Sequence, residues 1–171
     1  MTILSTERLL IRHLEPGDLG PLYALYGDPE MRRYYPDGTL TLDQTRRELE
    51  WFLHGHPECP ELGLWATIDR KTGEFVGRCG LLPWSIDGTD EVELAFMIKK
   101  GRWRQGLATE AARGIIRYAA STLGLARLIC LVMPGNDASV GVATKVGMRF
   151  ERDYLDEFGL SHIYALALPA S

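Results

Sequence analysis

The chain has 171 residues, 46% of them hydrophobic and 25% charged, and a formal net charge of −4. This length predicts a single domain covering residues 1–171, and the composition is ordinary for a globular protein. The acidic balance and the lack of a basic block or tail argue against nucleic acid as the main partner. No signal-peptide pattern follows Met1 and no apolar run approaches the ~20 residues of a membrane span, so we expect no membrane partner. Three cysteines without framework spacing predict reduced thiols and a cytoplasmic location.

The first part of the chain predicts one strand and two helices. Partial alternation over residues 3–14 predicts a first strand at the edge of a sheet. We expect Asp18 to cap a short helix that reaches Tyr26. Either Thr41 or Asp43 then caps a second helix.

Three strands and two turns follow. Residues 62–69 and 75–82 flank a turn rich in polar residues, which predicts a hairpin. The turn Asp87-Gly88-Thr89-Asp90 leads into a third strand over residues 91–98. We expect these three strands to form an antiparallel meander.

A long amphipathic helix begins near Gly106, and a buried strand follows it. Apolar residues recur at every fourth position from Leu107 to Leu123, and Gly124 is a typical stop signal. Residues 127–133 are almost continuously apolar, as in a central strand covered on both faces. The strand–helix–strand order predicts a right-handed crossover that joins two parallel strands.

The last third of the chain contains one ambiguous segment, residues 136–147. Its β-branched alternation favours a strand, but Asn136 is a good helix N-cap and Gly147 a good stop, so we predict a helix. Residues 148–155 and 160–168 then predict a terminal hairpin.

The turn between the third meander strand and the long helix predicts an anion site. Gly106 and Ala108 allow an anion to approach the backbone, and the helix start offers unpaired N–H groups and a positive dipole end. The GxxxxGK[ST] and GxGxxG patterns of nucleotide sites are absent. The alternative is a tight turn without a ligand.

The segment Trp103-Arg104-Gln105-Gly106-Leu107-Ala108 resembles motif A of the GNAT acyltransferases, Q/R-x-x-G-x-G/A, with Trp at its first position. The following Thr-Glu-Ala resembles the ribosomal-protein acetyltransferase (RimJ/RimL-type) branch. Residues 136–139 and 145–148 resemble the N-x-x-S…K-x-G-F segment of the family, with Met148 in place of Phe. The resemblance implies a mixed α/β fold with a mostly antiparallel sheet of about seven strands and about four helices.

The resemblance also implies acetyl-CoA as cosubstrate and a set of residues that bind it. The diphosphate is expected at the turn, and the pantetheine is expected on the backbone of the preceding strand and at Asn136. The residues expected to bind the cosubstrate are Phe96, Met97, Ile98, Arg104, Gln105, Gly106, Leu107, Ala108, Thr109 and Asn136.

Acetyl transfer to an amine requires a base for the amine and a donor for the departing thiolate. Glu93 is the favoured base, because a carboxylate near apolar groups has a raised pKa. Its alternatives are Glu91 on the same strand, Glu157 in the terminal hairpin, and water. Ser139 resembles a serine that approaches the CoA sulfur in related enzymes, and its alternative role is to cap its own helix.

We therefore predict an acetyl-CoA-dependent N-acetyltransferase that acts by direct transfer, as a monomer or homodimer. The resemblance implies a protein N-terminal amine as acceptor, with a small amine as the alternative. No metal is expected, and Cys130 is expected to be an inert buried thiol away from the chemistry. The rival functions are a non-catalytic acyl-CoA-binding regulatory module and a protein that binds another phosphate ligand.

Overall fold

The computed structural model describes residues 1–169 and contains eight strands and four α-helices within them. Two 3₁₀ turns, η1 (Pro16–Asp18) and η2 (Lys100–Arg102), precede α1 and α3. In chain order the other elements are β1 (Thr2–Ser5), β2 (Leu9–His13), α1 (Leu19–Tyr26), α2 (Leu42–Phe52), β3 (Gly63–Asp69), β4 (Phe75–Ile86), β5 (Thr89–Ile98), α3 (Leu107–Ser121), β6 (Arg127–Val132), α4 (Asp137–Lys145), β7 (Arg149–Asp156) and β8 (Gly159–Ala167).

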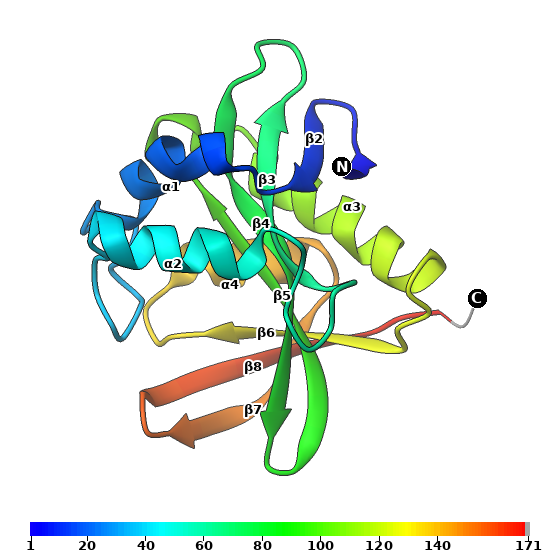
Figure 1. Ribbon diagram of the computed structural model, residues 1–171. Helices are drawn as coiled ribbons and strands as arrows, with labels where there is room; N and C mark the ends of the chain where they lie inside the picture. The colour runs from blue at the N-terminus through cyan, green and yellow to red at the C-terminus, as the bar shows by residue number, and fades with distance from the viewer. Residues whose placement is uncertain (170–171) are drawn as a thin grey trace.

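All eight strands form one sheet, in the order β1-β2-β3-β4-β5-β6-β8-β7 (Figure 1). Strands β3, β4 and β5 form the predicted antiparallel meander. Strands β5 and β6 pair in parallel through the crossover helix α3, as the sequence predicts. The ambiguous segment is the helix α4, and the terminal hairpin is β7–β8.

The sheet has one strand more than predicted, because residues 3–14 form a hairpin and not a single strand. Strand β1 turns back at Thr6, whose N–H donates to the carbonyl of Leu9 at 2.8 Å. A carboxylate of α3, Glu110, accepts hydrogen bonds from the Thr6 hydroxyl and the Arg8 N–H at 2.6 and 2.8 Å. This long-range contact fixes the hairpin turn.

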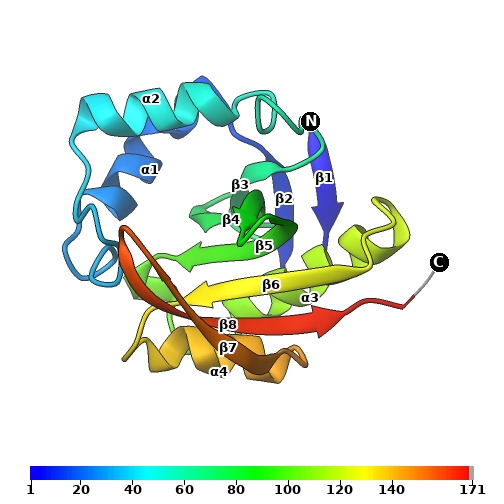
Figure 2. The same cartoon turned by 90° about the horizontal axis from the view of Figure 1, so that it is seen from below.

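Helices cover both faces of the sheet, with α1 and α2 on one face and α3 and α4 on the other (Figure 2). Because side chains alternate along a strand, each strand contributes to two cores. Leu64 and Ala66 of β3 pack with α1 and α2, whereas Trp65 between them packs with α3. No helix among residues 1–169 is long and apolar enough to span a membrane.

The predicted N-cap of α2 is observed, but the predicted side-chain cap of α1 is not. The Thr41 hydroxyl accepts from the Gln44 N–H, so Thr41 is the cap of α2. We predicted that the Asp18 side chain caps α1, and this prediction is wrong, because its side chain makes no capping hydrogen bond with that helix. Its carboxylate instead binds the guanidinium of Arg12 at 2.8 Å, because a buried carboxylate gains more from a charged partner.

Candidate active site

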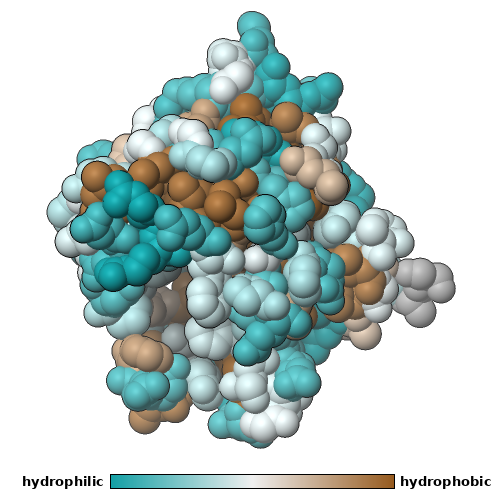
Figure 3. All heavy atoms as spheres, viewed as in Figure 1, coloured by the Kyte–Doolittle hydropathy of each residue, from teal (hydrophilic) through white to brown (hydrophobic). Residues whose placement is uncertain are grey.

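A cleft opens where the parallel strands β5 and β6 stop pairing. They pair at Glu93 and Ile129, and beyond this point side chains replace the ladder. The Glu93 carboxylate accepts from the Leu131 N–H, and the carbonyl of Leu94 accepts from Cys130 Sγ at 3.1 Å. The surface is hollowed on the same side, between the loop from α1 to α2 and the β7–β8 hairpin (Figure 3).

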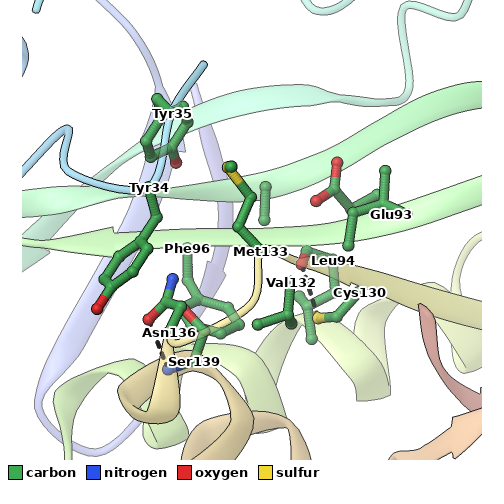
Figure 4. Close-up of a pocket in the computed structure, with 12 residues that line it drawn as sticks. Tyr34, Tyr35, Glu93, Leu94, Phe96, Cys130, Val132, Met133, Asn136 and Ser139 are labelled. Atoms are coloured by element: carbon green, nitrogen blue, oxygen red, sulfur yellow. Dashed lines mark hydrogen bonds between the residues drawn. The ribbon is translucent and has the colours of Figure 1, made fainter. Parts of the chain in front are cut away.

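The cleft has a volume of about 110 Å³ and is lined from both faces of the sheet (Figure 4). Side chains from the α1–α2 loop, β5, β6 and the start of α4 meet there. Its lining residues are Tyr34, Tyr35, Glu93, Leu94, Ala95, Phe96, Cys130, Leu131, Val132, Met133, Asn136 and Ser139.

Glu93 is the one carboxylate among these lining residues. It is half-buried, and loss of hydration raises its pKa to about 7. The indole N–H of Trp84 donates to it at 2.7 Å, and this bond together with the charge of Arg78 limits the rise in pKa. A carboxyl group that titrates near pH 7 can accept a proton at neutral pH.

The other carboxylates considered for the base are placed differently. Glu91 forms an ion pair with Arg127, with Nε 3.0 Å from Oε2. Glu157 lies in the exposed turn between β7 and β8 and does not line the cleft. The geometry therefore favours Glu93 over both.

Ser139 reaches the cleft from the first turn of α4. Asn136 caps this helix, because its side-chain oxygen accepts from the Ser139 N–H at 3.2 Å. Ser139 therefore has no capping task. Among the described residues, none accepts a hydrogen bond from its hydroxyl group, which stays available as a donor.

Glu93 and Ser139 approach the cleft from opposite faces of the sheet. Glu93 shares its face of β5 with Ala95 and Met97, which pack against α1 and α2. Ser139 belongs to α4, whose apolar side packs with α3 on the other face. A group that passes between β5 and β6 would lie between the two side chains.

The start of α3 has the backbone geometry of an anion site. Gly106 is the N-cap residue with φ +75°, and Arg104 has φ +60°. Left-handed residues in such a turn are typical of concave arrangements of N–H groups that bind anions. The N–H groups of Leu107, Ala108 and Thr109 precede the first intrahelical bond, which joins the Glu110 N–H to the Gly106 carbonyl at 3.0 Å.

An arginine from the turn between β1 and β2, Arg8, supports the α3 turn, although nothing in the sequence pattern singles it out. The Arg8 guanidinium donates to the Gln105 carbonyl at 2.9 Å and to the Glu110 carboxylate at 2.6 Å. Arg8 directly precedes β2 in the turn of the unforeseen β1–β2 hairpin, and this hairpin brings it to α3.

The three residues expected to hold the pantetheine are not equivalent. Phe96 lines the cleft, whereas Met97 and Ile98 are buried beside it. The Met97 carbonyl is turned toward β4, close to Gly77, and the Ile98 carbonyl accepts from the Trp103 indole at 2.6 Å. Because backbone groups alternate along a strand, the Phe96 backbone faces the open side, as that of Ile98 does. The Phe96 carbonyl differs from that of Ile98 in not being bound to Trp103.

Two tyrosines of the α1–α2 loop and a buried arginine of β4 form another part of the cleft. Tyr34 and Tyr35 line the cleft, and Arg78 of β4 donates to the Tyr35 hydroxyl at 2.9 Å. The sequence offered two signals that we did not use. They are an aromatic pair directly before the turn Pro36-Asp37-Gly38, and one arginine inside an otherwise apolar strand.

Cys130 is buried, and burial raises its thiol pKa well above the usual range. An unreactive thiol is therefore expected, as predicted. Its position differs from the prediction, because Cys130 lines the same cleft as Glu93. Within residues 1–169, no group of three or more potential ligands is arranged to hold a metal ion.

Comparisons with known proteins bear on this geometry. A family model described as "Acetyltransferase (GNAT) domain" matches residues 8–149. The Bacillus subtilis protein YkkB is 34% identical over 152 residues, which cover 88% of this chain and 87% of YkkB. A GNAT-family acetyltransferase from Bacillus anthracis is 25% identical, covers 98% of both chains and superposes with a TM-score of 0.83. RimL, a ribosomal L7/L12 alpha-N-protein acetyltransferase solved with CoA, shares the fold at a TM-score of 0.80, with 14% identity over 100% of both chains.

The chain belongs to the GNAT acetyltransferase family. It is an acetyl-CoA-dependent acyltransferase with the mixed α/β fold of that family.

Proposed function

We propose that this enzyme acetylates an α-amine, such as a peptide N-terminus, by direct transfer across the cleft between β5 and β6. The observation that carries the proposal is the pairing of Glu93 and Ser139 on opposite sides of one cleft. Acetyl-CoA, when bound, supplies the reactive thioester. The turn from Arg104 to Thr109 would hold its diphosphate, and Asn136 and the β5 backbone at Phe96 would hold its pantetheine.

Glu93 accepts the proton of the attacking amine in this mechanism. Its pKa of about 7 is one unit below that of an α-amine, at about 8, and more than three units below that of an alkylamine, at about 10.4. Deprotonation by Glu93 is therefore far less unfavourable for an α-amine. A single carboxylate in the lining also gives little support for binding a polycation.

Ser139 donates a hydrogen bond from its hydroxyl to the departing thiolate from the α4 side, and the proton that converts the thiolate to the thiol comes from solvent, to which Glu93 releases the proton of the amine. Its hydroxyl is free of a capping role, so donation breaks no bond within the protein. The charge formed at the thiolate is greatest late in the reaction, where such a donor contributes most.

Further support comes from the surface and from a structural neighbour. The hollow beside the cleft is open to solvent and suits the end of a chain more than an enclosed small molecule (Figure 3). The same fold serves an alpha-N-protein acetyltransferase in RimL. The three unpaired thiols are typical of a cytoplasmic protein, and we assign the chain to that compartment. We also assign residues 1–171 to one catalytic domain.

The test is a comparison of kcat/KM at pH 7 for three acceptors, with product masses mapped by fragmentation. The acceptors are a lysine-free peptide with a free N-terminus, the same peptide N-blocked with one lysine added, and a polyamine. We expect acetylation at the α-amine to be fastest by at least 10-fold. Faster acetylation of the polyamine or the lysine would overturn the proposed acceptor class.

A further inference from the structure

Two adjacent tyrosines in the cleft use their hydroxyl groups in opposite ways. The Tyr34 hydroxyl donates its proton to the carbonyl of Gly135 at 2.8 Å. The Tyr35 hydroxyl accepts a hydrogen bond from Nη2 of Arg78 at 2.9 Å. Figure 4 shows the two rings at the same end of the cleft, with their hydroxyl oxygens pointing in different directions.

Arg78 cannot take the Tyr35 proton in return. A guanidinium group has only donors, so the Tyr35 O–H must find its acceptor elsewhere. Among residues 1–169, none accepts from this hydroxyl. Because Tyr35 lines the cleft, its proton is available to a group bound there.

The surrounding contacts hold this donor in place. Arg78 is only 4% exposed, and its Nε donates to the Tyr26 hydroxyl at 3.0 Å. The Tyr26 hydroxyl in turn donates to Glu48. The Arg32 guanidinium also lies over the Tyr35 ring, 4.1 Å from its centroid. A donor fixed in advance loses little conformational entropy when a ligand binds.

The positive charge near the Tyr35 hydroxyl indicates which kind of group this hydroxyl would bind. Arg78 is buried and positive, and its Nη1 has no hydrogen-bond partner among the described residues. A positive charge behind a hydroxyl donor favours an oxygen acceptor and disfavours a second cationic nitrogen. The amine itself would face Glu93, which lies elsewhere in the lining of the same cleft.

We propose that Tyr35, oriented by Arg78, donates a hydrogen bond to the carbonyl oxygen next to the reacting amine of the acceptor. This inference rests on the proposed α-amine acetylation and narrows it. The acceptor class is an α-amine that carries an adjacent carbonyl, as every peptide N-terminus does. A simple alkylamine lacks the carbonyl oxygen that would accept this hydrogen bond from Tyr35.

The experiment is a double-mutant cycle between the protein and the acceptor. One acceptor is a tripeptide, and the other is the same molecule with an alkene in place of its first peptide bond, which keeps the shape but removes the carbonyl. The measured quantity is the ratio of kcat/KM for the two acceptors, compared between wild type and Tyr35→Phe. The intrinsic reactivity of each amine cancels in this comparison.

We expect Tyr35→Phe to reduce the preference for the carbonyl-bearing acceptor about threefold to tenfold, the size of one net hydrogen bond. Tyr34→Phe is the matched control, because its hydroxyl is already bound to Gly135. It should change both acceptors by the same factor. A thermal shift with acetyl-CoA in each variant verifies that the fold and the cosubstrate site persist.

The outcomes separate this inference from the function on which it rests. Equal losses for both acceptors in Tyr35→Phe would overturn the role of Tyr35 and leave α-amine acetylation intact. Wild-type turnover of an alkylamine but not of the tripeptide would overturn both. With Tyr35→Phe already in place, adding Arg78→Met should cause no further loss of preference, and a further loss would show that Arg78 does not act through Tyr35.

Discussion

Glu93 owes its chemistry to the backbone around it. In a continuous parallel ladder the Leu131 N–H would pair with β5, but here it donates to the Glu93 carboxylate. The carboxylate is thus drawn into the gap between the strands, where loss of hydration raises its pKa to about 7. The same break in the ladder produces both the cleft and the environment of Glu93, the proposed base.

Arg78 adjusts the titration of Glu93 from the same face of the sheet. Its positive charge favours the carboxylate form, so Arg78→Met should raise the pKa of Glu93 and move the acidic limb of the kcat profile to higher pH. The other groups that act on Glu93 are Trp84 and the Leu131 N–H, and both stay in place in this variant. Profiles measured from pH 5.5 to 9 check the direction.

Tyr35→Phe is the control for this shift, because it removes a partner of Arg78 and keeps the charge. Its acidic limb should stay at the wild-type position. An unmoved limb in Arg78→Met, in protein that still binds acetyl-CoA, would show that Arg78 does not influence the base.

Ser139→Ala tests the donor to the leaving group. We expect turnover to fall by about 100-fold, because the departing thiolate loses its hydrogen-bond donor. The loss should shrink with an acyl donor whose thiol has a lower pKa, since that group needs less help to leave. The measurement is kcat for a series of acyl thioesters, and a loss that is equal across the series would refute the assigned role.

The turn between the secondary-structure elements β5 and α3 combines two residues with left-handed backbone conformation and the start of a helix. Gly106→Val should weaken acetyl-CoA binding strongly, because a β-branched residue disfavours φ +75° by about 1–2 kcal/mol or more. The added side chain would also stand where the anion approaches. Isothermal calorimetry and the melting shift caused by acetyl-CoA measure the effect.

Gly101→Ala provides the comparison for Gly106→Val. Gly101 lies nearby with open space around it and no left-handed backbone, so its variant should bind like the wild type. A Gly106→Val protein with a full acetyl-CoA response would place the anion site elsewhere.

The elements that the sequence predicts well are those defined by local periodicity. The stripe of α3 and the apolar run of β6 lead directly to the β5–α3–β6 crossover and hence to the position of the cleft. The first hairpin was missed because its turn depends on Glu110, about a hundred residues away. A contact of that range leaves no periodic signal in the sequence.

Some residues of the candidate site could likewise be predicted from the sequence, and others could not. Glu93, Ser139 and Asn136 were selected from the sequence, and the structure places all three around one cleft. Tyr35 and Arg78 were not, because their interaction joins the α1–α2 loop to β4 through tertiary packing. The roles assigned to all these residues stay predictions until the variants are measured.

For the whole molecule, the cleft lies where the two helical layers meet through the sheet, so a bound ligand contacts both. Tyr34 of the α1–α2 loop already reaches across to Gly135 of the β6–α4 loop. Acetyl-CoA should therefore raise the melting temperature, and above Kd the rise should grow with the logarithm of the acetyl-CoA concentration, as expected for a ligand that binds the native state alone. Dephospho-CoA and pantetheine derivatives in the same assay show how much of the effect comes from the phosphates.

If this cleft is the active site and Glu93 is its base, the pH dependence of kcat for an α-amine peptide must differ between the wild type and Glu93→Gln. We expect the wild type to lose activity below pH 7, where Glu93 is protonated, and the acidic limb of the variant to move up to about pH 8, where the α-amine itself loses its proton. Near pH 7 the variant should be about 100-fold slower, and the deficit should shrink above pH 8, where the α-amine is already neutral. The Kd for acetyl-CoA should be unchanged. Wild-type turnover and an unaltered pH profile in Glu93→Gln, at unchanged acetyl-CoA affinity, would show that Glu93 is not the base.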